Sequence, residues 1–365
     1  MPSSPILTTI GVMSGTSMDG IDVSVVRTDG EAEVTAGPGR TYPYEPALRQ
    51  RLLDLLRDPA RAQTDPLEDL EGAVTRAHAG AVQRYMAETG LKAGAVALAG
   101  LHGQTVYHRP QQLFTRQLLD GPLAARLLKI DVVARFRHAD VAAGGEGAPF
   151  APLFHRALAS GLDGPLMVLN LGGVANVTYI AGDTVIAFDT GPASALLDDF
   201  MLRRRGLAYD ADGALAASGR ADPALVAAFM DNPFFDRPAP KSLDRQDFHA
   251  GAQAVEGLND ADGAATLAAF TVASVAAALR HVPEPAARWL VTGGGRRNAH
   301  LMSRLGQALG VPVDPVEAVG WDGDFLEAQC FGYLAVRSLR GLPLSLPTTT
   351  GVPHPMPGGD LFRAR

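Results

Sequence analysis

A phosphate-binding turn is indicated close to the start of the chain. An apolar run breaks there into Ser-Gly-Thr-Ser-Met-Asp-Gly before apolar residues resume, a pattern that predicts two strands joined by a tight turn. In such a turn Gly15 lets the backbone approach an oxyanion closely, while Thr16 and Ser17 offer hydroxyl donors. The carboxylates of Asp19 and Asp22 could orient the water shell of Mg²⁺, which prefers oxygen ligands. Taken alone, the stretch is equally compatible with an ordinary polar hairpin.

A second candidate carboxylate, Asp189, follows the predicted strand 184–188 directly. A carboxylate in this place can be held rigidly at the floor of a cleft at the edge of a sheet. Gly191 and Pro192 then open a predicted helix, whose N-terminal N–H groups attract anions. The alternative is that Asp189 only caps that helix, which aspartate does well.

Further glycine-rich turns follow apolar strands, at junctions of the kind where α/β proteins bind ligands. They are His102-Gly-Gln-Thr105, Gly172-Gly173 and Gly293-Gly294-Gly295. A P-loop is excluded because no lysine stands in a G-x-x-x-x-G-K-[ST] pattern. The stretch 293–298 only partly matches G-x-G-x-x-G and comes too late for a typical Rossmann fingerprint, and the protein-kinase motifs H-R-D and D-F-G are absent.

Two successive modules are predicted to position these turns. Each opens with three strands and continues with alternating helices and strands, which indicates a duplicated α/β architecture. The opening strands are expected at 8–13, 21–27, 32–36, 166–171, 175–180 and 184–188. We expect a first module at 1–162, a second at 163–340 that includes a last helix at 324–339, and an irregular, proline-rich tail at 341–365.

Composition limits the class of protein. A chain of 365 residues favours two domains, and 47% hydrophobic with 19% charged residues is typical of a soluble folded protein. The net charge is −7 with no long basic block, so a nucleic-acid partner is not expected. The stretch Ala264–Leu279 looks too short and too polar to cross a membrane, and no Lys or Arg precedes Arg27. The single Cys330 excludes an internal disulfide, and we expect a cytoplasmic protein.

The layout of two modules with two phosphate loops and a distal adenosine loop resembles the superfamily of actin, chaperone and hexokinase-like ATPases. This resemblance implies two RNase H-like modules, each a mixed sheet flanked by helices, that face each other across a nucleotide cleft and close on binding. Seven sequence blocks then resemble the anhydro-N-acetylmuramic acid kinase family, in the family's order and over nearly the whole chain. The blocks are SGTSMDGID at 14–22, LHGQT at 101–105, DVAAGGEGAP at 140–149, NLGGVANVT at 170–178, FDTGPA at 188–193, VTGGGRRNAHLM at 291–302 and DFLEAQCFGYLA at 324–335.

The resemblance implies an activity. Kinases of this family transfer the γ-phosphate of ATP to O6 of 1,6-anhydro-N-acetylmuramic acid, a small sugar recycled from peptidoglycan. Water opens the anhydro bridge in the same turnover, which gives N-acetylmuramic acid 6-phosphate. ATP and Mg²⁺ are the implied cofactors, and a homodimer is the implied assembly. The alternatives are another sugar or acetate-type kinase on this fold, or a non-kinase ATPase of the actin type.

The same resemblance assigns roles to residues. Asp189 would be the general base, Glu327 would reach the sugar, and Arg137 with His138 would contact the lactyl carboxylate or a hydroxyl. The ATP phosphates would be bound by Gly15, Thr16, Ser17, Met18, Asp19, Gly20, Ile21, Asp22, Gly172 and Gly173. The adenosine side would be bound by Thr292, Gly293, Gly294, Gly295 and Asn298, and Mg²⁺ by Asp19 or Asp22 through water. Glu327 could also be an ordinary helix carboxylate, and His138 a solvated loop residue.

Two stretches depart from the family pattern. Ala193-Ser194 stands where the family usually has Gly-Asn, which bears on backbone packing near Asp189. Lys241-Ser-Leu-Asp-Arg-Gln246 stands where Lys-Ser-Thr-Gly-Arg-Glu is common, which bears on the contacts of that loop.

Overall fold

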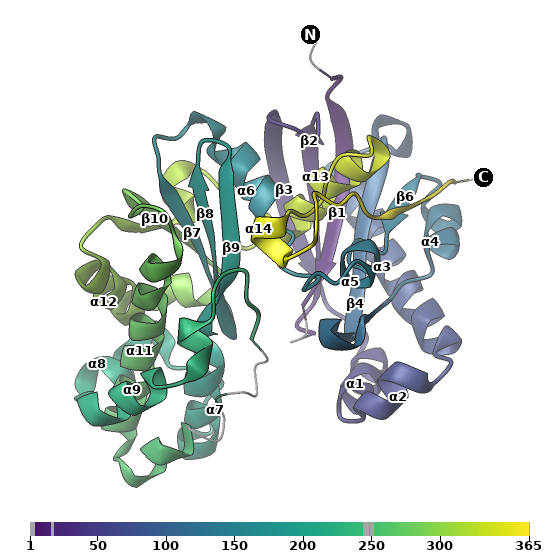
Figure 1. The fold of residues 1–365 in the computed structure, drawn as a ribbon. Coiled ribbons are helices and arrows are strands. Elements are labelled where there is room, and N and C mark those ends of the chain that lie inside the picture. Colours follow the sequence, from purple (N-terminus) through teal and green to yellow (C-terminus); the bar gives the residue numbers. More distant parts are fainter. Residues whose placement is uncertain (1–3, 16–17, 244–247, 249–251, 365) are drawn as a thin grey trace. The chain divides into compact units, whose positions relative to one another are not determined.

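The computed structural model describes the chain except for residues 1–3, 16–17, 244–247, 249–251 and 365 (Figure 1). It divides the chain into two compact units. One unit combines Met1–Gly161 with Phe325–Arg365, and the other is Leu162–Asp324. The α/β prediction, with mixed sheets flanked by helices, is confirmed.

The first unit is built on a seven-stranded mixed sheet in the order β12-β6-β4-β1-β2-β3, with β5 paired to β4. Its strands are β1 (Leu7–Ser14), β2 (Ile21–Thr28), β3 (Val34–Tyr42), β4 (Leu98–Arg109), β5 (Phe114–Leu118), β6 (Val132–Ala134) and β12 (Asp360–Phe362). Strands β1, β2 and β3 form an antiparallel meander, whereas β4 and β6 run parallel to β1. The predicted opening strands are therefore confirmed, but the predicted turn at 102–105 is wrong because β4 continues through it.

Helices cover both faces of this sheet. Ile10 and Val12 share a buried core with α3, while the intervening Gly11 faces α13 so closely that its missing Cβ would lie 1.8 Å from the carbonyl oxygen of Ala328. The helices are α1 (Pro46–Leu56), α2 (Pro59–Thr64), α3 (Glu68–Thr89), α4 (Gly121–Leu128), α5 (His138–Ala142), α6 (Pro152–Leu158), α13 (Leu326–Leu339) and α14 (Pro347–Thr350). Short 3₁₀ turns are η1 (Ala93–Ala95), η2 (Pro110–Gln112) and η3 (Ala159–Gly161).

The end of the chain belongs to the first unit, which corrects two predictions. Helix α13 was expected in the second module, but it belongs to the first unit and packs on β1, β2 and β4 (Figure 1). Gly11 in β1 and Gly100 in β4 make room for it. The tail was expected to be irregular, yet it forms α14 and then β12, which pairs antiparallel with β6. Both segments pack against partners more than 200 residues away along the chain, so no local pattern indicated these partners.

The second unit is built on a five-stranded sheet in the order β11-β10-β7-β8-β9. Its strands are β7 (Leu166–Leu171), β8 (Val174–Ala181), β9 (Thr184–Pro192), β10 (Arg288–Thr292) and β11 (Val313–Pro315). Its helices are α7 (Ser194–Arg205), α8 (Ala214–Ser218), α9 (Pro223–Met230), α11 (Asp260–Ala277) and α12 (Ala299–Leu309). Short 3₁₀ turns are η4 (Ala211–Gly213), η5 (Pro233–Asp236), η6 (Gln253–Gly257), η7 (Ala278–His281), η8 (Gly294–Arg297) and η9 (Val316–Val319).

Helix α11 forms much of the core of this unit, together with Trp289, Phe188 and Phe200. The helical segment Asp260–His281 is long and apolar enough to cross a membrane. The prediction that Ala264–Leu279, which lies within it, is too short and too polar to do so is therefore wrong. Within the protein 72% of its apolar window is buried, and the core helix of a folded unit has the same composition.

The two sheets share one topology. In each, an antiparallel meander of three strands is followed by two strands that run parallel to the first, in the matching orders β3-β2-β1-β4-β6 and β9-β8-β7-β10-β11. Strands β7, β9 and β10 therefore point the same way, and their carboxyl ends meet at one edge of the second sheet. The predicted turns that follow β7 and β10 lie at that edge.

Candidate active site

The predicted turn between β1 and β2 is present. Gly15 accepts a hydrogen bond from the backbone N–H of Met18 at 3.1 Å, and Met18 is fully buried with a left-handed φ of 56°. The Met18 carbonyl in turn accepts from Nε of Arg49 at 3.1 Å. Thr16 and Ser17, the predicted hydroxyl donors, lie outside the described residues. Gly15 and Met18, the described residues on either side of this gap, are thus held by hydrogen bonds to each other and to Arg49.

A buried polar network supports this turn from behind. Nε2 of Gln104 donates to the Gly15 carbonyl at 3.1 Å, and Oε1 of Gln104 lies 2.8 Å from Oγ of Ser14. The Tyr44 hydroxyl lies 3.0 Å from Oγ of Ser14 and 2.8 Å from Nε2 of His78. Burial lowers the pKa of His78 to about 4, so its ring is neutral near pH 7. Sequence reasoning missed Tyr44 and His78, because each looks like an ordinary core residue until the fold joins them.

Two carboxylates and an arginine interact with one another in the first unit. Glu327 is an exposed residue in the first turn of α13. Desolvation of its carboxyl group raises its pKa, Arg137 opposes this shift and Asp22 adds to it. Arg137 donates through Nε to Nε2 of His102 at 2.8 Å and through a terminal nitrogen to the Gly147 carbonyl at 2.5 Å. The structure thus brings together Glu327, Asp22 and Arg137, three of the predicted site residues.

His138, the fourth predicted residue of this group, has different neighbours. It begins the short helix α5, and burial lowers its pKa with Arg135 as the next contributor, while Asp360 opposes the shift. These charges lie in β12 and beside β6, so the structure associates His138 with the C-terminal strand. Its predicted contact with substrate has no support in this geometry.

The glycine-rich segment after α5 is fastened to the end of the chain. The buried Asp140 carboxylate accepts from the Gly147 N–H at 2.7 Å and from the Thr350 hydroxyl at 2.6 Å, and the Ser345 hydroxyl donates to it as well. The backbone N–H of Glu146 donates to the Thr350 carbonyl at 2.7 Å. The tail that the sequence predicted to be irregular therefore braces the loop that Arg137 also holds.

In the second unit Asp189 lies within β9. The helix predicted to start next to it begins only at Ser194, because β9 extends to Pro192 and pairs with β8 along its length. Asp189 is therefore no helix cap. Its backbone N–H donates to the Lys241 carbonyl at 2.9 Å, and its Oδ2 accepts from the Leu243 N–H at 2.8 Å. The side chain is half-buried.

A row of polar residues runs across the sheet to Asp189. Thr292 in β10 pairs with Asn170, Asn170 with Asn176, and Asn176 with Asp189. Directly paired residues on neighbouring strands point to the same face of a sheet. The row therefore links the end of the predicted adenosine-binding strand to the candidate base, and Asn170 is a residue that sequence reasoning did not single out.

The Gly172-Gly173 turn supports the start of α7. The Gly172 carbonyl accepts from both the N–H and the hydroxyl of Ser194 at 2.9 Å, and the Gly173 carbonyl accepts from the Ala193 N–H at 3.0 Å. Ser194 is one of the departures from the family pattern, and its hydroxyl adds a bond here. The departure at Leu243 is equally compatible with the site, because the backbone N–H makes its bond to Asp189.

The predicted adenosine loop follows β10. Gly293 has a left-handed φ of 78°, and its missing Cβ would lie 2.4 Å from Oδ1 of Asn170, so only glycine fits. Asn298 caps α12, since its Oδ1 accepts from the Leu301 N–H at 2.9 Å. Arg296 fastens the loop through Glu317 and Asp324, at 2.8 and 2.7 Å. Gly294 begins η8, and nothing lies within 4 Å of the position that a Cβ would take there, so this face of the loop has free space.

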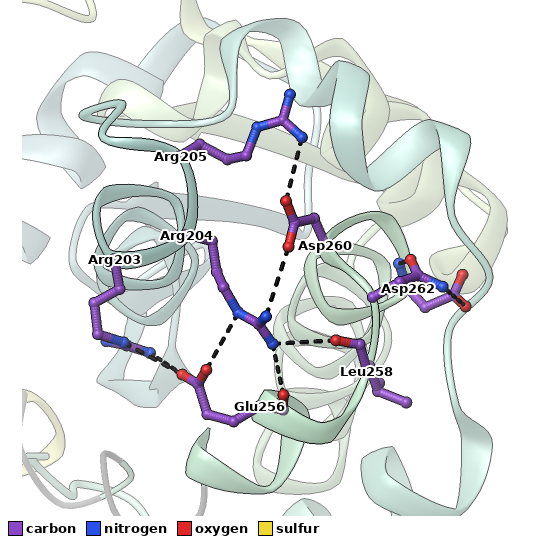
Figure 2. Close-up of polar contacts among 8 residues, drawn as sticks. Arg203, Arg204, Arg205, Glu256, Leu258, Asp260 and Asp262 are labelled. Carbon is purple, nitrogen blue, oxygen red and sulfur yellow. Dashed lines mark hydrogen bonds and ion pairs between the residues drawn. The ribbon is translucent and has the colours of Figure 1, made fainter.

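The basic run at the end of α7 is paired with carboxylates, as Figure 2 shows. Arg203 and Arg204 both contact Glu256, at 2.9 and 3.2 Å, and Arg205 contacts Asp260 at 3.2 Å. A cavity of about 590 Å³ is lined by Leu196, Asp199, Arg203, Ala252, Gln253 and Glu256. The charges of this run join α7 to η6 and to the start of α11.

The chain is similar in sequence to known proteins. The profile of the family described as anhydro-N-acetylmuramic acid kinase matches residues 7–364. The chain is 54% identical over 357 residues to the anhydro-N-acetylmuramic acid kinase of Rhodospirillum rubrum, covering 97% of this chain and 94% of that protein. It is also 54% identical over 359 residues to that of Acidiphilium cryptum, covering 97% and 98%. Among solved structures, the activator of the 2-hydroxyisocaproyl-CoA dehydratase from Clostridium difficile with bound ADPNP aligns over 92% of this chain and 96% of that one, with 9% identity and a TM-score of 0.47.

Proposed function

The chain belongs to the anhydro-N-acetylmuramic acid kinase family, and we propose that Asp189 is the general base of its reaction. The activity is that of an ATP-dependent phosphotransferase that acts on O6 of 1,6-anhydro-N-acetylmuramic acid, in the recycling of peptidoglycan. Its products are N-acetylmuramic acid 6-phosphate and ADP.

The chemistry explains why a base is required although the acceptor oxygen carries no proton. The oxygen of a water molecule attacks the anomeric carbon, and the bond from that carbon to O6 breaks. The freed O6 forms a bond to the γ-phosphorus of ATP, and the bond from that phosphorus to the β-γ bridging oxygen breaks to release ADP. The proton lost by the water passes to Asp189. A carboxylate of ordinary basicity suffices, because phosphorus captures the leaving oxygen.

The observation that carries this proposal is the way Asp189 is held. One carboxylate oxygen accepts from the Leu243 N–H at 2.8 Å, and the backbone of Asp189 is fixed in β9 by its pairing with β8 and by the Lys241 carbonyl. A base must keep its carboxylate in one orientation toward the attacking water. This combination of a strand, an amide donor and a half-buried side chain meets that requirement.

For the nucleotide we propose two contact regions. The turn from Gly15 to Asp22 binds the phosphates together with Gly172 and Gly173, and the loop from Thr292 to Asn298 binds the adenosine side. Because the Asn298 side chain caps α12, its backbone is the part available to ATP. The space beside Gly294 is the place where the loop can approach a ligand.

Mg²⁺ fits this donor set as a partner of the nucleotide. Among the residues that the structure describes, no group of three or more His, Cys, Asp and Glu is placed to hold a metal. Asp19 is exposed and Asp22 is half-buried, so their carboxylates can hold Mg²⁺ through water while the phosphates supply direct ligands. When bound, the ion neutralises charge on the transferred group.

For the sugar we propose Glu327 and Arg137 as the contacts in the first unit. Glu327 stands in the first turn of α13, and its carboxyl oxygens can accept a hydrogen bond from a sugar hydroxyl. The Arg137 guanidinium can bind the lactyl carboxylate with the donors that His102 and Gly147 do not use. We also propose that the enzyme is a homodimer and works in the cytoplasm, where ATP is available.

The test is turnover of ATP and 1,6-anhydro-N-acetylmuramic acid in ¹⁸O-labelled water, with wild type and Asp189→Asn. We expect label at the anomeric oxygen of a 6-phosphorylated product, and loss of product in the variant. Phosphorylation of a reducing sugar in preference to the anhydrosugar would indicate an ordinary sugar kinase. Nucleotide-dependent light scattering without any sugar product would indicate a filament-forming ATPase.

A further inference from the structure

Lys241 is a buried cation held by backbone carbonyl oxygens. Its side chain is only 4% exposed. Nζ lies 2.9 Å from the Phe234 carbonyl oxygen, 3.1 Å from the Phe235 carbonyl oxygen and 3.1 Å from Nε2 of His281. Two of the three N–H donors of the ammonium group therefore have backbone carbonyl acceptors, and the group also faces the ring of His281, whose Nε2 lies 3.0 Å from the Phe235 carbonyl oxygen. The Phe234 ring lies 4.7 Å from Nζ and adds a favourable cation–π contact.

The same residue and its neighbour hold Asp189. The Lys241 carbonyl accepts from the Asp189 N–H, and two residues later the Leu243 N–H donates to the carboxylate. Residues 237–243 form neither helix nor strand, so no ladder of backbone bonds keeps this segment in place. The ammonium group supplies that fixation, because it ties the segment to the carbonyls of η5 and to the ring of His281.

We propose that Lys241 is a positioning residue for Asp189: its ammonium group anchors the segment whose Leu243 amide orients the carboxylate. The inference rests on the role of Asp189 proposed above. Lys241 acts from behind the site, since its Nζ is enclosed by protein and its effect reaches Asp189 only through the backbone of residues 241–243. Loss of the anchor lets the Leu243 amide move away, and the carboxylate then loses both its orientation and a donor that favours its ionised form.

The protonation states of the neighbours are consistent with this arrangement. Burial lowers the pKa of His281, so its ring is neutral beside the ammonium group, and its Nε2 lies within hydrogen-bond distance of both Lys241 Nζ and the Phe235 carbonyl oxygen. Burial also lowers the pKa of Lys241 to about 8, with Arg237 and Arg280 acting in the same direction and Asp236 against it. The folded-state pKa lies below the ordinary 10.5, so the anchor is protonated below pH 8 and weakens as the pH rises through that value.

The test measures kcat, KM and their pH dependence in Lys241→Met, with Lys92→Met as the matched control at an exposed site. We expect kcat to fall at least about 10-fold in Lys241→Met, since misplacement of a catalytic group by about 1 Å can cost about 100-fold. We expect KM for ATP to stay within about twofold, because Lys241 contacts Asp189 and not the ATP-binding turns. The acidic limb of kcat/KM should move to higher pH, because the carboxylate has lost a donor.

A second variant keeps the test decisive if Lys241→Met fails to fold. Lys241→Arg retains a cation that does not titrate in this range, so the fall in wild-type kcat above about pH 8 should be absent from it. A folded Lys241→Met with wild-type kcat and unshifted pH limbs would overturn the inference, as would a lower kcat with both limbs unmoved. If Asp189→Asn itself remains active, the proposed base is wrong, whatever Lys241 does.

Discussion

The packing of α13 on β1 gives the sharpest prediction for the fold. A Cβ built on Gly11 lies 1.8 Å from the Ala328 carbonyl oxygen and 2.5 Å from the Gly332 nitrogen, whereas real Cβ atoms keep at least 3.0 Å from such neighbours. Both atoms are backbone, so the Gly11→Ala variant must push the helix back by about 1 Å. Overpacking of this kind costs about 3 kcal/mol. The melting temperature should then fall by about 6–12 °C.

The control for this prediction is Gly80→Ala in α3. A Cβ at Gly80 meets nothing within 4 Å, so the variant should gain about 1 kcal/mol from helix propensity and melt slightly above wild type. Thermal melts followed by circular dichroism at 222 nm compare the three proteins. In Gly11→Ala the displaced helix carries Glu327 with it, so KM for the sugar should rise more than KM for ATP. A Gly11→Ala protein that melts within about 1 °C of wild type would refute the close approach of α13 to β1.

Two further predictions concern buried groups of the first unit. Burial lowers the pKa of His155 from 6.5 to about 3 in the folded protein. Between these two pH values the unfolded chain binds a proton at His155 and the folded chain does not. The free energy of unfolding should therefore fall by about 1.4 kcal/mol per pH unit as the pH drops from 6.5 toward 3. The His155→Leu variant should reduce this slope in urea titrations, and an identical slope would contradict the assignment. Asp140→Leu leaves the Gly147 N–H and two hydroxyls without their acceptor, at about 1–3 kcal/mol each. It should melt well below Asp140→Asn, which keeps an acceptor oxygen, and equal melting of the two variants would count against the brace.

Local patterns were sufficient for the meanders and the turns between them. Alternating apolar residues around Gly15 and around Gly172 predicted hairpins, and the strands formed close to those bounds. These elements depend on residues that are close together in the sequence, because a hairpin pairs two strands that are joined by a short turn. Asp189 was singled out as a candidate for the same reason, since an apolar strand leads directly to it.

The features that the sequence did not predict depend on packing between residues that are far apart in the chain. Gly11 and Gly100 in the strands make room for α13. The residues around these glycines do not indicate that a helix more than 200 residues later packs against them. The prediction that Asp189 stands at a helix start failed because β9 gains pairing energy from β8 through Pro192, an outcome of sheet formation and not of helix propensity. Lys241 was named only as the first residue of a stretch that departs from the family pattern. Its side-chain contacts are backbone carbonyls and the ring of His281, which no sequence pattern displays.

The shared topology explains why the candidate site residues stand where they do in both units. A meander followed by parallel strands brings the carboxyl ends of its first, third and fourth strands to one edge, whatever side chains it carries. In the second unit those ends supply Gly172, Asp189 and Gly293, and in the first unit the corresponding first strand leads into the turn at Gly15. The two sequences need share no motif for this, because backbone direction alone fixes the edge. What the topology leaves open is the orientation of each side chain at that edge. The carboxylate of Asp189 is oriented by the Leu243 N–H, which belongs to a segment outside the sheet. In our proposal the buried ammonium group of Lys241 holds that segment in place.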